Sequence, residues 1–269
     1  MIAPPFAISR KAQVQPPSMV IYGVEGIGKT ALAAQFDKPF FLMSPRETGL
    51  LTLQSSGQIG EVDRFPVLNT WYELSTALSW LACGDHDYRT LIIDTINGVE
   101  RDLYFKFVLD TQFGGDASKF TAYAKDKKYT HDLWKVFLDS LNRCRERGLA
   151  IVLLGHAMVS RMNDPDGKDY DRYIPRFANQ ATWDMTFACV DVVMFANHVT
   201  ATFEDGSRTK GRSTGIRMLY TEKRPAFDAK NRYRLPAQID MGGSAKEAYA
   251  NLMAAFAESR KRNQEEQTQ

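Results

Sequence analysis

Apolar residues in this chain fall into short continuous runs that alternate with longer stretches of helical spacing. The runs predict strands at Met19–Tyr22, Pro39–Met43, Thr90–Ile93, Leu149–Leu154 and Val190–Ala196. Helices are predicted over Thr30–Phe36 and over Asn69–Leu81, where one stripe is formed by Trp71, Leu74, Leu78 and Leu81. Because strands that are apolar throughout belong to sheets covered on both faces, we expect an α/β fold with a mostly parallel sheet flanked by helices.

The pattern changes after Ala201, where glycine-rich turns separate short strand candidates at Ile216–Thr221 and Arg232–Pro236. These predict antiparallel strands at one sheet edge near the C-terminus. A last helix is predicted from Ser244, with Glu247 completing a capping box, and the polar residues after Ser259 are expected to fray. We therefore divide the chain into a loose arm with four prolines at 1–17, a core at 18–240, and a C-terminal helix with a polar tail at 241–269.

The first predicted strand runs into GVEGIGKT, which fits the pattern G-x-x-x-x-G-K-[ST]. Such glycines let the backbone curl so that successive N–H groups point at phosphates, while the lysine reaches the β- and γ-phosphates and the hydroxyl ligates Mg²⁺. The next helix presents its positive end to the same anion. The motif predicts binding of ATP with Mg²⁺ by Gly23, Glu25, Gly26, Ile27, Gly28, Lys29, Thr30 and Ala31. A plain glycine turn is the alternative interpretation.

Three polar residues at strand ends are candidates for the rest of an ATPase site. Asp94 ends an apolar strand that we expect beside the P-loop strand, where it would hold Mg²⁺ together with Thr30, or else cap a turn. Glu47 follows the second predicted strand and could polarise the attacking water, or be a solvated loop residue. His156 follows the strand Ala150–Gly155 and could report the γ-phosphate, or be a hydrogen-bonded core histidine.

Charge is nearly balanced, with 34 basic and 32 acidic residues, so a basic surface must be local. The segment Arg208–Arg234 carries nine basic residues against two acidic ones. Within it, Lys230 and Arg232 are two residues apart and would share one side of a strand, from which they could reach a neighbouring subunit's γ-phosphate. The remaining cations, which could follow a nucleic-acid backbone, include Arg208, Lys210, Arg212 and Arg217. A solvated face is the alternative for the whole segment.

Two further segments combine cations with aromatic residues, which suits single-stranded nucleic acid. One loop runs from Asp94 to about Lys128 and carries Phe113, Gly114, Gly115, Lys125, Lys127 and Lys128. The other loop, Val159–Gln180, carries Arg161, Lys168, Arg172, Arg176, Tyr170, Tyr173 and Phe177. Four aspartates in the second loop, at positions 164, 166, 169 and 171, keep an ordinary surface loop as the alternative.

The order of these elements resembles that of the RecA-like ATPases, over about residues 18–240. The chain is most similar to the phage-encoded RecA-like nucleotide-binding proteins, a group that includes single-strand annealing ATPases. The matching stretches are GVEGIGKT, LIIDT, LLGHA, DYDRYIPRFANQ leading to VDVVMFANH, and DAKNRYRLP. The resemblance implies a RecA-like P-loop NTPase in which Lys29 is catalytic, Glu47 is the base and His156 the sensor. Lys230 and Arg232 would be fingers that act in trans.

The resemblance also implies partners and a reaction. We expect a Mg²⁺-dependent, DNA-stimulated ATPase that assembles as a homo-oligomeric ring or filament with shared ATP sites, binds single-stranded DNA in recombination or annealing, and meets a single-strand binding protein. It implies the cytoplasm of a bacterial host. Three sparse cysteines indicate reduced thiols, and no apolar run reaches the ~18 residues of a membrane span.

Two other functions remain open. One is a nucleotide-switched assembly factor that binds protein, such as a helicase loader or packaging accessory. The other is a small-molecule kinase, which the late pair Lys230 and Arg232 disfavours because such enzymes usually close a lid over one active site.

Overall fold

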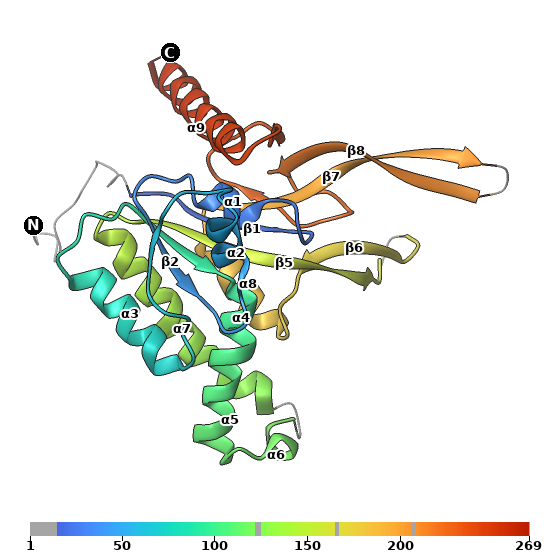
Figure 1. Ribbon diagram of the computed structural model, residues 1–269. Helices are drawn as coiled ribbons and strands as arrows, with labels where there is room; N and C mark the ends of the chain where they lie inside the picture. Colours follow the sequence, from blue (N-terminus) through green and yellow to red (C-terminus); the bar gives the residue numbers. More distant parts are fainter. Residues whose placement is uncertain (1–14, 122–124, 165–166, 206–207, 269) are drawn as a thin grey trace, which may run out of the picture.

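The computed structural model describes residues 15–121, 125–164, 167–205 and 208–268 (Figure 1). Within these ranges the backbone alone is described for residues 121, 125–131, 201–205, 208–213 and 267–268. The predicted N-terminal arm therefore lies outside the described residues up to position 14.

The described residues form one sheet in the order β10-β8-β7-β1-β5-β4-β2-β3, to which β6 adds by pairing with β5 and β9 by pairing with β7. The run from β7 to β3 is parallel, and β6, β8, β9 and β10 pair antiparallel. The strand bounds are β1 Ser18–Gly23, β2 Pro39–Met43, β3 Asp63–Arg64, β4 Thr90–Asp94, β5 Ala150–Met162, β6 Tyr170–Pro175, β7 Val192–Asp205, β8 Arg208–Tyr220, β9 Lys230–Asn231 and β10 Gln238–Asp240.

Helices cover both faces of this sheet. Side chains of successive strand residues point to opposite faces, so strands that are apolar throughout need a cover on each face. The helix bounds are α1 Lys29–Ala33, α2 Gly49–Ser55, α3 Trp71–Cys83, α4 Ile96–Gly98, the π-helix η1 Val99–Tyr104, α5 Phe105–Phe113, α6 Ala117–Thr121, α7 Lys125–Glu146, α8 Gln180–Cys189 and α9 Ala245–Thr268. Side chains of α3, η1, α7 and α8 pack on one face, and those of α1, α2 and α9 on the other.

The predicted α/β class with a parallel sheet and antiparallel strands near the C-terminus is confirmed. One expectation about strand order is wrong, because β5 lies between the P-loop strand β1 and the Asp94 strand β4. Hydrophobic periodicity marks where a strand runs, but neighbours in a parallel sheet are chosen by packing between distant segments.

Two strands continue well past the sheet and form two-stranded ribbons that project from the same end of the molecule (Figure 1). β5 pairs with β6 from Ala157↔Pro175 to Met162↔Tyr170, and β7 pairs with β8 out to Asp205↔Arg208. Residues 159–162 and 170–175 of the predicted loop Val159–Gln180 therefore belong to a β-ribbon. The predicted short strand Ile216–Thr221 is the end of a 13-residue strand. Ribbon residues outside the core lack the apolar runs by which the other strands were found.

Three further expectations fail. The segment after Asp94 is not a loop, because it forms α4, η1, α5 and α6 before α7 starts at Lys125, and the side chains of Lys127 and Lys128 lie outside the described ones. Arg232–Pro236 is a turn in which the Asn231 side chain accepts a hydrogen bond from the Leu235 N–H at 2.9 Å.

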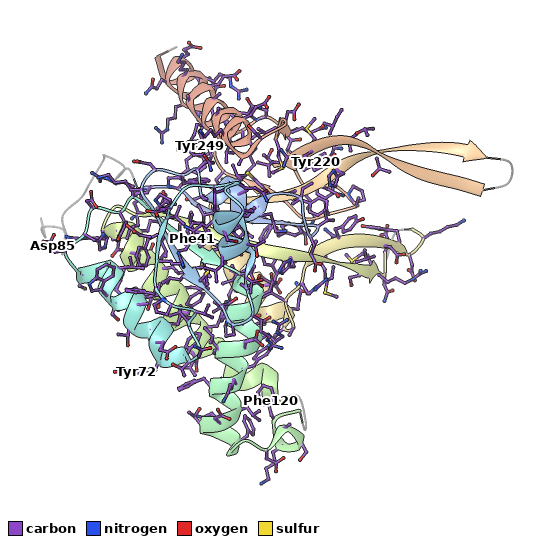
Figure 2. The ribbon with its side chains drawn as sticks, viewed as in Figure 1. Phe41, Tyr72, Asp85, Phe120, Tyr220 and Tyr249 are labelled. Atoms are coloured by element: carbon purple, nitrogen blue, oxygen red, sulfur yellow. The ribbon has the colours of Figure 1, made fainter. Side chains whose placement is uncertain are left out.

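The C-terminal tail is helical to Thr268 instead of frayed. The Arg234 guanidinium pairs with Glu266 of α9, and Arg262 donates to the Arg234 carbonyl. At its other end α9 is anchored by the ring of Tyr249, which meets Phe36 after α1 at 5.1 Å between centroids (Figure 2). The start of α9 is the predicted one, since the Glu247 N–H donates to the Ser244 hydroxyl.

Candidate nucleotide-binding and catalytic site

The glycine loop leaves the carboxyl end of β1, between β5 and β7, and leads directly into α1. A side chain at Gly23 would meet the Ala196 carbonyl oxygen at 2.1 Å, so only glycine fits beside β7. Gly26 and Gly28 have φ angles of 75° and 102°, in the left-handed region that other residues avoid. The strand, the curled loop and the helix that the motif requires are therefore all present.

Lys29 lies inside this loop and is 7% exposed. Its Nζ donates to the carbonyl oxygens of Gly23 at 3.1 Å and Val24 at 2.9 Å. Burial lowers the pKa of the Lys29 ammonium to about 8, against the opposing charge of Asp94. The ammonium is thus held at the loop by two carbonyls that carry no full charge, and an anion would stabilise it.

Thr30 and Asp94 meet directly, with the Thr30 hydroxyl donating to Asp94 Oδ2 at 2.9 Å. Burial raises the pKa of the Asp94 carboxyl to about 6, and the hydrogen bond from Thr30 opposes this. When Mg²⁺ is bound to phosphates, the protein supplies only a few of its oxygen ligands. A hydroxyl and a carboxylate suit that role, so the Thr30–Asp94 pair fits Mg²⁺. No cluster of three or more His, Cys, Asp or Glu residues that could hold a metal is found in the described residues.

Glu47 and His156 face each other at the same cavity. Glu47 Oε1 accepts from the Thr95 hydroxyl at 3.1 Å and lies 3.4 Å from His156 Nε2. The hydrogen bond with His156 holds the pKa of the Glu47 carboxyl below its usual range, although partial burial opposes it. The backbone N–H of His156 donates to Asn97 Oδ1 at 2.7 Å, which fixes β5 against α4 at the point where its pairing with β1 ends. Glu47 is therefore held in a fixed orientation at the cavity, with a pKa that favours the carboxylate form.

One cavity of about 640 Å³ joins these groups. It brings together Glu25, Gly26, Gly28, Lys29, Thr30 and Ala31 of the P-loop segment with Asp94, Glu47 and His156. The sequence did not indicate the rest of the lining, which consists of Gly49, Thr52, Leu53 and Gln58 in and after α2, Thr95, Arg217, and residues 243–245 at the start of α9. Thr95 could have been found from its position directly after Asp94, whereas no local pattern pointed to the α9 residues.

Lys230 and Arg232 do not reach this cavity within one chain. β9 pairs with Val192 and Val193 at the start of β7, whereas the P-loop lies at the carboxyl end of β1. The Lys230 Nζ donates to the Phe187 carbonyl at 2.6 Å, and Arg232 donates to the Ala188 carbonyl at 3.3 Å. Both side chains reach the end of α8, but not as two residues of one strand, because β9 ends at Asn231 and Arg232 lies in the turn that follows. A role in a neighbour's site stays a prediction about an oligomer.

Three residues proposed for DNA contact pack against the core, Arg172 buried and Tyr173 and Phe177 half-buried. Arg172 is 8% exposed and forms an ion pair with Asp228. The Tyr173 ring packs on Phe195, and Phe177 packs on Trp183. Arg161 stays on the surface of the β5–β6 ribbon, 3.6 Å from Asp169, and Arg176 lies 3.6 Å from Glu25. The side chains of Arg208, Lys210 and Arg212 lie outside the described ones.

A parallel sheet with a P-loop after a central strand, a Thr–Asp pair beside it and a carboxylate across the cavity define the fold and site of a P-loop NTPase. Residues 15–233 match the AAA domain family, and the chain belongs to that family of P-loop ATPases. The chain is also similar to the flagellar accessory protein FlaH from Methanocaldococcus jannaschii, at 10% identity and a TM-score of 0.43, over 83% of this chain and 84% of that one. No curated protein matches the sequence.

Proposed function

We propose that this protein binds ATP with Mg²⁺ in the 640 Å³ cavity, hydrolyses it, and acts on single-stranded DNA in recombination or strand annealing. Lys29 and the loop N–H groups hold the phosphates, and Thr30 and Asp94 hold the metal, which neutralises charge on the phosphates. Glu47 accepts a proton from the attacking water. His156 orients Glu47 and responds to the γ-phosphate. The contact between Glu47 and His156 beside the P-loop is the observation that carries this assignment.

The position of the two ribbons supports an action on DNA. β1, which leads into the P-loop, lies between β5 and β7, and the extensions of these two neighbours are the ribbons. The β5–β6 pairing begins at Ala157, directly after His156. His156, which would respond to the γ-phosphate, is therefore adjacent in sequence to a projecting ribbon that carries the exposed cation Arg161. We propose that these ribbons hold a single strand through charge and stacking.

The same proposal includes an oligomer. Lys230 and Arg232 lie at the far end of the sheet from their own P-loop. In a ring or filament such residues can face the next subunit's nucleotide, where an arginine stabilises charge on the γ-phosphate. A single-strand binding protein would then be a neighbour on the same DNA.

ATP hydrolysis with and without single-stranded DNA tests this function. We expect hydrolysis that needs Mg²⁺ and rises when a single strand is added, whereas duplex DNA of the same length has a smaller effect. Glu47→Gln protein serves as the control for contaminating ATPases. Hydrolysis unaffected by any DNA, together with no binding to a labelled single strand at low salt with ATP, would contradict the DNA part of the proposal.

A second function is favoured by apolar exposure on the same ribbon. Met158, Val159 and Met162 of β5 are 36%, 56% and 40% exposed, which suits contact with protein more than with phosphates. A nucleotide-switched assembly factor would use this surface to bind a protein partner in one nucleotide state. If single-stranded DNA binding fails, this becomes the leading account.

A further inference from the structure

Arg217 of β8 lies against the P-loop from the opposite end of the chain. Its Nη1 donates to the Ile27 carbonyl at 3.3 Å, and its Nη2 donates to the Gly242 carbonyl at 2.8 Å. A side chain at Gly28 would come within 2.9 Å of Nη1, so the guanidinium covers the crest of the loop. Arg217 also lines the nucleotide cavity, together with residues 243–245 at the start of α9.

The charge of this arginine has no carboxylate partner among the described residues. The two carbonyls use two of its five N–H donors and neutralise nothing. The side chain is half-buried, and a partly desolvated guanidinium is most stable beside an anion. The cavity it borders is the one that the P-loop prepares for phosphates.

The position along the P-loop indicates which part of a nucleotide would meet Arg217. The charges of Asp94, Glu25 and Glu47 act on Lys29, so these residues mark the end of the cavity where the γ-phosphate would react. Arg217 instead contacts the segment at Ile27 and Gly28, in the loop whose N–H groups cradle the α- and β-phosphates. These phosphates are common to ATP and ADP.

We propose that Arg217 is a nucleotide-binding residue that acts in cis on the α- and β-phosphates and links the nucleotide to the β7–β8 ribbon and to α9. This inference rests on the proposed nucleotide binding. Arg217 faces His198 across the β7–β8 pair, and its carbonyl accepts from the Met241 N–H at 2.9 Å. One residue therefore touches the phosphate cavity, the base of the ribbon and the segment that leads into α9.

Calorimetry of the full chain with Mg²⁺-ATP and Mg²⁺-ADP tests the proposal. We expect Arg217→Gln to weaken both nucleotides by a similar factor of about 10–100, the scale of a hydrogen bond to a charged group. Arg217→Lys keeps the charge but loses the fork, and should weaken both by a smaller factor. Arg224→Gln is the matched control, since this exposed arginine rests on the Tyr220 ring outside the cavity and its loss should change neither affinity.

A second readout separates binding from folding. In wild-type protein either nucleotide should slow amide hydrogen exchange at residues 216–220 and 241–248, and in Arg217→Lys protein this protection should shrink although exchange elsewhere is unchanged. Wild-type affinities in both Arg217 variants would overturn the proposal while leaving the ATP site intact. A loss confined to ATP would also overturn it, because Arg217 would then read the γ-phosphate. A wild-type protein that binds neither nucleotide would overturn the proposed function as well.

Discussion

Glu47 is oriented by hydrogen bonds from the Thr95 hydroxyl and from His156, two residues that lie far from it in the sequence. The backbone around it contributes too, because Arg46 has a φ of 68° and its guanidinium pairs with Asp102 of η1. The peptide N–H of Thr95 is itself held by the Ser44 hydroxyl at 3.0 Å. The Glu47 carboxylate, the proposed base, is thus positioned by contacts from several distant segments.

Replacement of the base tests this arrangement. Glu47→Gln should bind ATP normally but hydrolyse it at least ~100-fold more slowly, because an amide cannot accept the proton from water. Single-turnover hydrolysis measures the chemical step. Glu25→Gln is the matched control, since Glu25 lines the same cavity but its side chain is 70% exposed and pairs with Arg176. Near-normal turnover in Glu47→Gln, with loss in Glu25→Gln, would move the base to Glu25.

The β5–β6 ribbon carries two arginines with different surroundings. Arg172 faces inward and pairs with Asp228, whose carboxylate also lies 3.8 Å from the Lys223 ammonium, whereas the Arg161 side chain is 65% exposed. The ion pair of Arg172 therefore attaches the ribbon to the core, whereas Arg161 is accessible to a partner. A sequence contains both as members of one basic cluster.

These two arginines should have opposite effects when removed. Arg172→Ala should lower the free energy of unfolding by up to about 3 kcal/mol, because the half-buried Asp228 loses its main partner. Arg161→Ala should change stability by less than ~1 kcal/mol, yet lower the salt slope of single-strand binding by about 0.7. Urea unfolding and salt-dependent fluorescence anisotropy measure the two quantities. Equal effects of both variants on stability would contradict this division.

The β7–β8 ribbon is predicted to carry more of the DNA charge. Replacing Arg208, Lys210 and Arg212 together by alanine should lower the slope of log affinity against log salt by about two, at roughly 0.7 per phosphate contact on a single strand. ATP binding by the isolated subunit should be unchanged. Tyr170→Ala should weaken the same binding with little change in slope, because stacking releases no counterions. Anisotropy titrations over a range of salt give both values, and an unchanged slope in the triple variant would exclude this ribbon.

At the scale of the whole molecule, the P-loop and the pair Lys230 and Arg232 occupy opposite ends of the sheet. Because of this separation, the P-loop and the Lys230–Arg232 pair of one chain cannot contact the same ATP molecule. If subunits share sites, mixing Arg232→Ala protein with Lys29→Ala protein should restore part of the hydrolysis that each has lost, since some interfaces receive one intact half from each. Co-assembly without any regained hydrolysis would remove the main support for fingers acting in trans.

Five strands of the parallel sheet, the P-loop and the position of Asp94 at a strand end could be predicted from the sequence alone. These features are local: a continuous apolar run specifies a buried strand, and GVEGIGKT specifies a curled loop before a helix. Pro39–Met43 was predicted with its observed bounds for this reason. Glu47 and His156 were found as polar residues at strand ends, which in a parallel sheet share one edge.

Which distant segments meet could be seen only in the folded chain. There β5 lies between β1 and β4, the predicted loops are ribbons and helices, Arg172 is buried, and Tyr173 and Phe177 pack against the core. The fold also brings Arg217 to the P-loop and holds Lys230 at the end of α8. Hydrophobic periodicity indicates whether a residue is buried, but it does not indicate which segment will pack against that residue. In the same way, the charge of a side chain does not indicate which partner will neutralise it.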